Sequence, residues 1–281
     1  MKKTYLAVIV AFGFAIFGNA YAGGHTAEKL MTEVEIPDTA IVLSEGYVPT
    51  VLITGANRGI GFEFVKVYLE RDYNIIATAR KPEKAEALNA LAAENDNLTV
   101  TQLDVTDFDR VDALALELEG QPIDILINNA GISGDTRSQF LGKVDYDNLR
   151  KVLEVNLLAP TKIAEAFYPN LLASEWKKLV VVSSSEGSIA GVSSPRMMGY
   201  RTSKAAINMM YTNIAVQVKR KGVTVVMVNP GLTDTDFVAG LPKKMLRPSD
   251  VAAQDMARNI DNTWVENTGT FWNYDGKALP W

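Results

Sequence analysis

Tyr200 and Lys204, a tyrosine and a lysine one helical turn apart, form a pair of side chains that can transfer protons. Residues four apart lie on the same face of a helix, so the phenol and the ammonium group are neighbours. A free tyrosine has a pKa of about 10 and is a poor base at neutral pH. An ammonium group ~5 Å away favours the phenolate by roughly 3 kcal/mol at an effective dielectric constant of ~20. The spacing therefore predicts an acid/base pair, with a packed tyrosine beside a solvated lysine as the alternative.

A glycine-rich segment lies far upstream, directly after a short apolar run at residues 51–53. Glycine permits a positive φ and a close backbone approach, and a helix N-terminus presents free N–H groups to a pyrophosphate. The spacing is Gly-x-x-x-Gly-x-Gly, which differs from the usual Gly-x-Gly-x-x-Gly. The segment predicts a dinucleotide site, with a sharp turn that binds nothing as the alternative. The residues assigned to it are Thr54, Gly55, Asn57, Arg58, Gly59, Ile60 and Gly61.

The end of the second predicted strand distinguishes the two nicotinamide cofactors. An acidic residue there binds the ribose 2′-hydroxyl, whereas a basic residue accommodates a 2′-phosphate. This chain has Arg80 and Lys81 at that position and no acid, and Arg58 in the glycine-rich segment can reach the same phosphate. We therefore predict that the cofactor is NADP(H). In the alternative interpretation, Arg80 is only a solvated charge after a strand and binds no phosphate.

Further polar residues follow later strands. Asp104 and Val105 come after the third strand, where the carboxylate can accept from an adenine amino group or cap the helix that begins near Asp107. Short amides and small residues end the fourth strand and suit either a turn against a ligand or a plain turn. The cofactor candidates in that stretch are Asn129, Ala130 and Gly131.

The fifth strand ends in a cluster of three serines, residues 183–185, at the edge where ligands bind in open α/β sheets. A hydroxyl there can polarise a substrate carbonyl. Asn156 lies in an apolar helical stretch and needs a hydrogen-bond partner. It either holds a water for proton relay or bonds to the backbone.

Composition narrows the chemistry. The chain of 281 residues has no Cys, which excludes a thiolate nucleophile and Cys-ligated zinc. Its single His, His25, lies in a polar stretch before the first predicted strand, so a Ser-His-Asp triad or a multi-His metal site cannot be built within one chain. A net charge of −5 gives no electrostatic argument for nucleic acid. Proton transfer is left to Tyr, Lys, Asp or Glu.

The N-terminus has a basic start, a short apolar run and an Ala-x-Ala ending, which is typical of a secretory signal peptide. We predict a signal peptide over residues 1–22 and export to the periplasm or medium, with an uncleaved membrane anchor over residues 4–22 as the alternative. Residues 23–47 are a polar linker, and residues 48–281 form one domain.

Short runs rich in Val and Ile alternate with amphipathic stretches along that domain. Such alternation predicts an α/β fold, a Rossmann-like doubly wound parallel sheet of about seven strands. The expected strands are residues 51–53, 74–79, 98–103, 123–127, 179–183, 223–228 and 270–272. The expected helices are residues 60–70, 82–94, 107–118, 148–172, 200–219 and 249–265, the fourth interrupted by Pro160 and Pro169.

These motifs together resemble the short-chain dehydrogenase/reductase family, from residue 50 to the end of the chain. The ordered set is the glycine-rich segment, Asp104, Asn-Asn-Ala-Gly at 128–131, Asn156, the serine cluster, Tyr200-x-x-x-Lys204, and Pro230-Gly231 with Thr235. The Glu-Gly-Ser-Ile at 186–189, the Arg-Thr-Ser-Lys-Ala-Ala at 201–206 and the C-terminal residues 275–281 are similar to the carbonyl-reductase and C-factor-like branch.

The resemblance implies a Ser-Tyr-Lys-Asn tetrad, in which Tyr200 is the acid/base and Lys204 lowers its pKa and binds the nicotinamide ribose. Ser184 carries the serine role, with Ser185 in reserve, and Asn156 supports a water relay. Pro230, Gly231 and Thr235 border the nicotinamide amide. The resemblance further implies a homodimer or homotetramer.

The expected substrate is an apolar carbonyl or alcohol compound. It would lie between loops 132–144, 188–199 and 232–247, which carry Ile132, Phe140, Ile189, Val192, Met197, Met198, Phe237 and Leu241.

Overall fold

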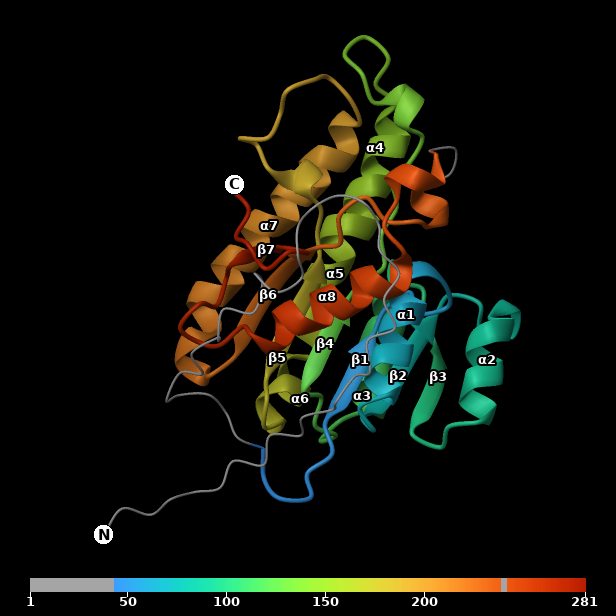
Figure 1. The fold of residues 1–281 in the computed structure, drawn as a ribbon, viewed down its shortest axis with the longest axis vertical. Helices are drawn as coiled ribbons and strands as arrows, with labels where there is room; N and C mark the ends of the chain where they lie inside the picture. Colours follow the sequence, from blue (N-terminus) through green and yellow to red (C-terminus); the bar gives the residue numbers. More distant parts are fainter. Residues whose placement is uncertain (1–42, 239–241) are drawn as a thin grey trace. The chain divides into compact units, whose positions relative to one another are not determined.

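Seven short apolar runs form one sheet in the computed structural model, which describes residues 43–238 and 242–281. All neighbouring strands are parallel and lie in the order β3-β2-β1-β4-β5-β6-β7 (Figure 1). The strands are β1 Thr50–Ile53, β2 Asn74–Ala79, β3 Leu98–Gln102, β4 Ile125–Asn128, β5 Lys178–Val182, β6 Thr224–Asn229 and β7 Phe271–Asn273. The predicted doubly wound parallel sheet is confirmed.

Helices connect the strands as the amphipathic pattern indicated. They are α1 Gly59–Leu69, α2 Glu86–Ala93, α3 Phe108–Glu117, α4 Tyr146–Leu153, α5 Ala159–Ala166, α6 Tyr168–Ala173, α7 Met198–Val218 and α8 Ser249–Asp261. The helix expected over residues 148–172 is divided into three, and a π-helical turn, Glu154–Leu158, joins α4 to α5. Pro160 and Pro169 occupy the first turns of α5 and α6, where a missing backbone N–H costs no hydrogen bond.

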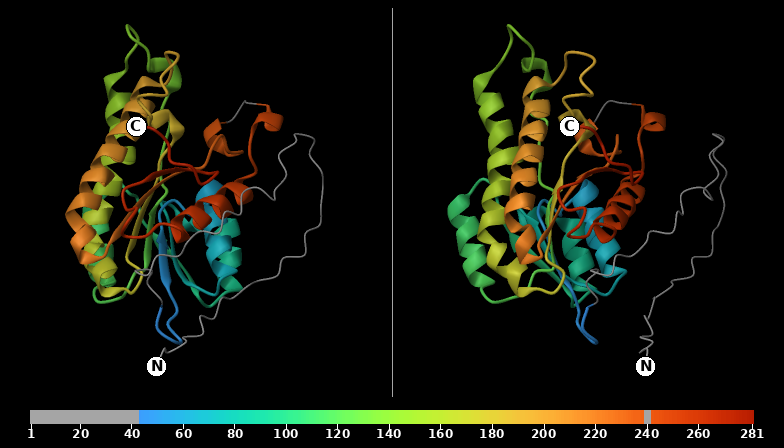
Figure 2. Two further views of the ribbon diagram at one scale, coloured as in Figure 1. Left: turned by 60° about the vertical axis from the view of Figure 1, so that its left-hand side comes forward. Right: turned by 90° about the vertical axis from the view of Figure 1, so that its left-hand side faces the viewer.

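The sheet buries both of its faces, because successive strand residues point to opposite sides. In β1, Val51 and Ile53 pack into one apolar core with α1 and α8, whereas Leu52 packs into a second core with α3, α6 and α7. Figure 2 shows these two helical layers on either side of the sheet. Double burial explains why the strands are apolar at successive positions instead of alternating.

The strand order reverses beside β1. Ile53, the last residue of β1, pairs with Ala77 of β2 on one side and Ile127 of β4 on the other. In an open α/β sheet, ligands bind outside the carboxyl ends of the strands at such a reversal. The residues singled out in the sequence follow β1, β4, β5 and β6 at this edge.

The predicted signal peptide and most of the predicted linker lie outside the described residues. Within the parts that the structure does describe, none of the helices combines the length and the apolar character needed to cross a bilayer.

Candidate active site

Tyr200 and Lys204 lie in the first two turns of α7 and are 6% and 5% exposed. The Lys204 Nζ is 5.8 Å from the centre of the Tyr200 ring and donates to the Val182 carbonyl at 2.8 Å. Phe237 packs against the same ring, with 5.3 Å between ring centres. The structure therefore brings the predicted pair together, buried beside the last residue of β5.

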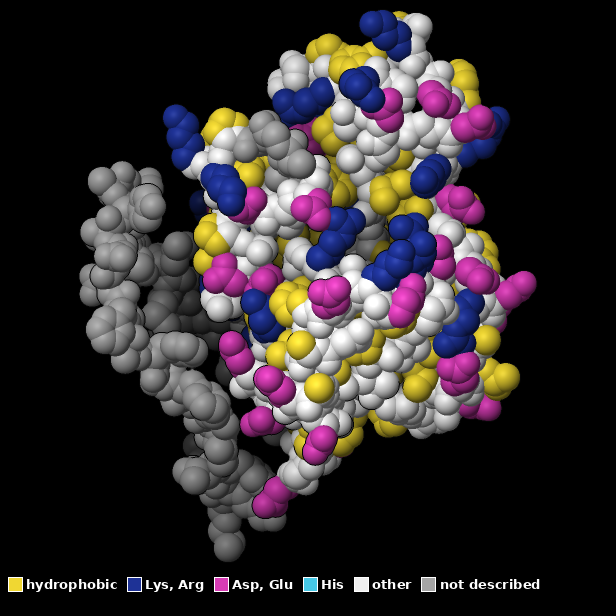
Figure 3. All heavy atoms as spheres, turned by 90° about the vertical axis from the view of Figure 1, so that its right-hand side faces the viewer, with side chains coloured by type: hydrophobic (Ala, Val, Ile, Leu, Met, Phe, Trp, Pro, Cys, Tyr) yellow, Lys and Arg dark blue, Asp and Glu magenta, His cyan; other side chains and the backbone are white. Residues whose placement is uncertain are grey.

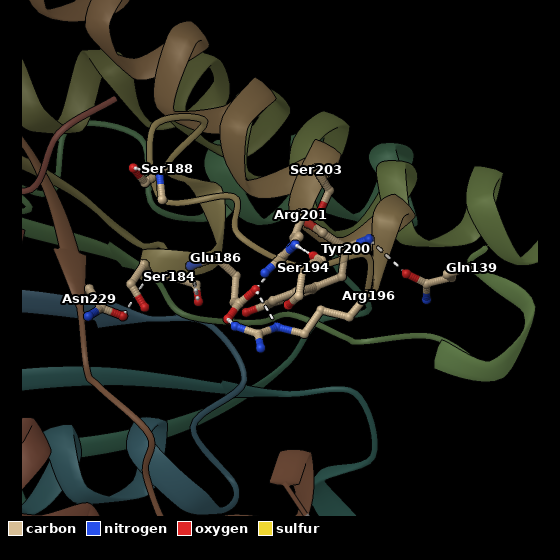
Figure 4. Close-up of polar contacts among 12 residues, drawn as sticks. Gln139, Ser184, Glu186, Ser188, Ser194, Arg196, Tyr200, Arg201, Ser203 and Asn229 are labelled. Carbon is tan, nitrogen blue, oxygen red and sulfur yellow. Dashed lines mark hydrogen bonds and ion pairs between the residues drawn. The ribbon is translucent and has the colours of Figure 1, made fainter. Parts of the chain in front are cut away.

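Ser184 is the serine that reaches the tyrosine. Its side chain hydrogen-bonds to the Tyr200 phenol, and its Oγ accepts from the Glu186 backbone N–H at 3.2 Å. The hydroxyl of Ser183 instead donates to Asn208 at 2.6 Å. The Ser185 side chain is exposed, and its backbone N–H donates to Asn229 (Figure 4). The geometry favours Ser184 over Ser185.

Asn156 lies in the π-helical turn and bonds to the backbone, which was one of the two alternatives. Its Oδ1 accepts from the Ile132 N–H at 2.9 Å, and its Nδ2 donates to the Ile132 carbonyl at 2.8 Å and to Ser203 Oγ at 3.0 Å. A Cβ added to Gly131 would lie 3.3 Å from Asn156 Oδ1 and 3.7 Å from Lys204 Nζ. Gly131 thus lies beside both groups, and the close spacing suits glycine.

Burial governs the ionisation of the pair. Burial raises the pKa of Tyr200 to about 12, while the hydrogen bond from Ser184 lowers this pKa and the charge of Glu186 raises it. Burial also lowers the pKa of Lys204 to about 8. The sequence predicted a lowered tyrosine pKa, and in the protein alone the shift has the opposite direction. The reason is that both charged forms lose water on burial, a cost that the spacing along the helix does not report.

The glycine-rich turn connects β1 to α1 and is tied to the end of β4. Thr54 Oγ1 accepts from the backbone N–H groups of Asn129 and Ala130 at 3.0 and 3.1 Å. The Asn129 Nδ2 donates back to the carbonyls of Thr54 and Gly55 at 2.9 and 3.2 Å. The side chains of Thr54 and Asn129 are therefore occupied in fixing this turn, and they shape the site through the backbone.

Two glycines of the turn are required by close approach and conformation. A Cβ on Gly61 would lie 2.5 Å from Asn129 Nδ2 and 3.0 Å from the Gly55 carbonyl carbon, which no side chain tolerates. Gly59 opens α1 with φ +54°, in the left-handed region. The glycines thus let the helix begin directly against the strand ends.

The N-terminus of α1 has the character of an anion site. Its first turn has no acidic residue, and no side chain within the described residues caps it. Ile60 and Asn57 are partly buried around it. Free N–H groups and the helix dipole attract a phosphate there.

Arg58 precedes α1 and forms an ion pair with Asp236, and both side chains are largely exposed, at 68% and 77%. Arg80 follows β2 and is also exposed. The turn and the end of β2 are neighbours, because the Ala56 N–H donates to the Thr78 carbonyl at 2.8 Å. Figure 3 shows Lys and Arg side chains at the rim of a hollow on one face of the molecule.

Asp104 does not cap α3. Its Oδ1 accepts from the N–H and hydroxyl of Thr106 at 3.1 and 2.8 Å, whereas Asp107 caps the helix by accepting from Arg110 N–H. Val105 packs against the second core. Within residues 43–238 and 242–281, both of these bonds end on Oδ1, which leaves the other carboxylate oxygen of Asp104 as an acceptor at the edge of the sheet.

The segment after β6 is held by Arg247. Its guanidinium donates to the Pro230 carbonyl at 2.6 Å and lies 3.8 Å from the Tyr274 ring centre. Thr235 lies against the start of α1, because its Cγ2 would be 3.3 Å from a Cβ on Gly59. Thr235 at the end of this segment therefore lies beside the N-terminus of α1, and the assignment of Pro230, Gly231 and Thr235 to the nicotinamide amide stays a prediction.

Several apolar side chains of the three predicted substrate loops are solvent-exposed. Ile189 is 73% and Val192 57% exposed, and Phe237 is 39% exposed beside Tyr200. Leu241 lies outside the described residues. Exposed apolar side chains beside the buried Tyr200 suit a hydrophobic substrate.

Residues that the sequence did not reveal hold Tyr200 in place. Gln139, from the loop after β4, accepts from the Tyr200 backbone N–H at 2.9 Å. Glu186 forms ion pairs with Arg196 and with Arg201, the residue after Tyr200 (Figure 4). Each of these contacts joins positions ten or more residues apart, so no local pattern could have indicated them.

The chain matches a known family over most of its length. The sequence model for short chain dehydrogenases matches residues 49–246. The chain belongs to the short chain dehydrogenase family. The predicted family is thus confirmed.

The matches between this short chain dehydrogenase and two relatives cover nearly the whole length of each relative. The 1-hydroxy-2-glutathionyl-2-methyl-3-butene dehydrogenase of a Rhodococcus species is 32% identical over 236 residues, covering 83% of the chain and 99% of the relative. The C-signal of Myxococcus xanthus is 34% identical over 160 residues, covering 57% of the chain and 93% of the relative.

Solved carbonyl reductases share the fold of this short chain dehydrogenase. The NADPH-bound carbonyl reductase from chicken fatty liver superposes with a TM-score of 0.78 at 31% identity, covering 83% of this chain and 99% of that one. The carbonyl reductase Sniffer of D. melanogaster superposes with a TM-score of 0.78 at 27% identity, covering 84% and 100%. The relatives thus include the two groups that the resemblance indicated.

Proposed function

We propose that this chain is an NADP(H)-dependent oxidoreductase that interconverts an aldehyde or ketone and an alcohol by hydride transfer, with Tyr200 as the acid/base. The observation that carries the proposal is the hydrogen bond between Ser184 and Tyr200 beside Lys204, at the carboxyl edge of the sheet. The similarity to carbonyl reductases, including one solved with NADPH, supports the same chemistry.

The residues at the sheet reversal fit the cofactor. The uncapped first turn of α1 suits the pyrophosphate, and the exposed Arg58 and Arg80 suit a 2′-phosphate. We assign Asp104 and Val105 to the adenine, and Pro230, Gly231 and Thr235 to the nicotinamide amide. When bound, the nicotinamide ring supplies or accepts the hydride.

The chain's own residues supply the proton and orient the substrate. Ser184 and Tyr200 present two hydroxyl groups to a carbonyl oxygen, and Tyr200 gives its proton to that oxygen as negative charge develops. A pKa of about 12 keeps the phenol protonated at neutral pH, so the free protein holds the form needed for reduction. The positive charge of Lys204 then stabilises the phenolate that remains.

The decisive test follows NADPH absorbance with a panel of aldehydes and ketones, comparing the wild type with Tyr200→Phe. Losing the phenol removes the acid and lowers kcat by about 10²- to 10⁴-fold, while the Kd for NADPH stays within about twofold. Tyr146→Phe, at an exposed tyrosine of α4, is the matched control and retains full activity. Wild-type turnover in Tyr200→Phe would refute the assignment.

A second candidate is an exported binding or signalling protein that keeps the fold without physiological turnover. The predicted signal peptide and the similarity to C-signal support it. Such a protein would bind NADPH, measured by nicotinamide fluorescence, and consume none with any carbonyl. Sequencing the mature N-terminus of the protein recovered from fractionated cells would test the export that this candidate requires.

A further inference from the structure

We infer that Gln139 is a positioning residue that fixes the backbone of Tyr200, the residue to which the proposed function assigns the proton transfer. Gln139 lies in the loop between β4 and α4, 61 residues before Tyr200, and its side chain is 2% exposed. Its amide has two partners: the Oε1 accepts from the Tyr200 N–H at 2.9 Å (Figure 4), and the Nε2 donates to the Ser133 carbonyl at 2.6 Å.

The first turn of α7 needs such a partner. The first N–H groups of a helix have no acceptor within it, and a Ser, Thr, Asn or Asp at the N-cap normally supplies one. Here the N-cap is Met197, with φ +47° in the left-handed region and no side-chain acceptor. Gln139 takes over this function from a distant loop, and its own carbonyl accepts from the Met198 N–H at 3.2 Å.

The carbonyl of Tyr200 is held as well. Ser203 Oγ donates to it at 2.7 Å, and Asn156 Nδ2 donates to Ser203 Oγ at 3.0 Å and to the Ile132 carbonyl at 2.8 Å. One chain of bonds therefore leads from the Tyr200 N–H through Gln139 to Ser133. The other leads from the Tyr200 carbonyl through Ser203 and Asn156 to Ile132.

The two chains end on the carbonyls of adjacent residues, Ile132 and Ser133, so together they form a polar ring that the backbone closes after β4. A buried side chain whose donor and acceptor are both used holds one orientation. Because proton transfer requires hydrogen-bond distance, a displacement of the phenol by about 1 Å costs as much as 10²-fold in rate. The ring thus links the loop that borders the substrate site to the position of the acid.

Two substitutions of Gln139 separate positioning from general stability. Gln139→Met keeps the size of the side chain and removes both bonds, so kcat falls by about 10- to 100-fold while the KM for NADPH stays within about twofold. Gln139→Glu keeps the acceptor for Tyr200. At high pH its carboxylate repels the Ser133 carbonyl, and at low pH the protonated acid donates to that carbonyl and restores the ring.

The kcat of Gln139→Glu relative to wild type therefore rises by about tenfold as the pH falls from ~9 to ~6. Both hydrogen-bond partners of the Gln139 side chain are uncharged backbone groups, so the titrating group that this ratio follows is the carboxyl introduced by Gln139→Glu. Gln217→Glu, at an exposed position of α7, adds the same charge and shows no such dependence. A flat ratio for Gln139→Glu, or wild-type kcat in folded Gln139→Met, would overturn the inference.

A readout without turnover distinguishes this inference from the proposed function. Amide hydrogen exchange at Tyr200 reports its backbone bond directly, and Gln139→Met speeds that exchange by about 10-fold or more relative to the remainder of α7. Faster exchange in a protein that reduces no carbonyl would uphold the positioning role and refute the proposed function. Unchanged exchange would refute the positioning role.

Discussion

The buried ammonium group of Lys204 lowers the stability of the fold. Its ammonium group is 5% exposed, and burial lowers its pKa from the usual 10.5 to about 8. At ~1.4 kcal/mol for each pH unit, keeping this group charged at neutral pH costs about 3 kcal/mol. We predict that Lys204→Met is more stable than the wild type at pH 7 and inactive.

The net gain is smaller than the burial cost, because the bond from Nζ to the Val182 carbonyl is lost. Such a bond contributes ~1 kcal/mol, which leaves about 2 kcal/mol in favour of the variant. For a domain of this size that corresponds to a Tm increase of about 4–8 °C. Urea unfolding followed by circular dichroism measures the free energy of unfolding of both proteins.

The pH dependence has a definite sign. Between pH 8 and pH 10.5 the unfolded wild-type chain binds more protons at Lys204 than the folded one, so wild-type stability rises with pH relative to the variant. The advantage of Lys204→Met therefore shrinks below ~1 kcal/mol near pH 10. Lys219→Met, at an exposed lysine just after α7, changes stability by less than ~0.5 kcal/mol at either pH. A variant less stable than wild type at pH 7, or a difference that does not vary with pH, would refute the reasoning.

Two further predictions concern charges at the site. Removing the negative charge in Glu186→Gln lowers the pKa of Tyr200, so the high-pH limb of the kcat profile moves to lower pH; a limb that moves upward or stays in place contradicts this assignment. Arg58→Ala raises the Kd for NADPH by about 10- to 100-fold and leaves NADH binding unchanged, measured by nicotinamide fluorescence. Asp236→Asn frees the Arg58 guanidinium from its ion pair and serves as the control, binding NADPH at least as tightly as wild type.

Much of the fold followed from local patterns. In residues 74–79, successive positions after Asn74 are small or β-branched and mostly apolar, a pattern that favours a strand buried on both faces. The glycine-rich turn was likewise predictable, since only glycine permits the φ of Gly59 and the close approach at Gly61. The four-residue spacing of Tyr200 and Lys204 fixed their common helix face before any packing was known.

Prediction was weaker where the backbone had alternatives of similar energy. In the stretch 148–172, Pro160 and Pro169 predicted an interruption, but the π-helical turn that places Asn156 against Ile132 had no signal in the sequence. Three adjacent serines carry the same functional group, so the sequence alone did not distinguish them. The path of the chain after β5 brings the Ser184 hydroxyl to Tyr200.

The local spacing of residues thus predicted that Tyr200 and Lys204 share one helix face, because helix geometry depends on residues that are near in sequence. Tertiary packing decided their energies and their exact orientation. It excludes water from Tyr200 and Lys204, which reverses the expected direction of the tyrosine pKa, and it supplies Gln139 from a loop 61 residues away. Desolvation and long-range hydrogen bonds depend on which segments cover a residue, and that is fixed only when the whole sheet and its helices assemble.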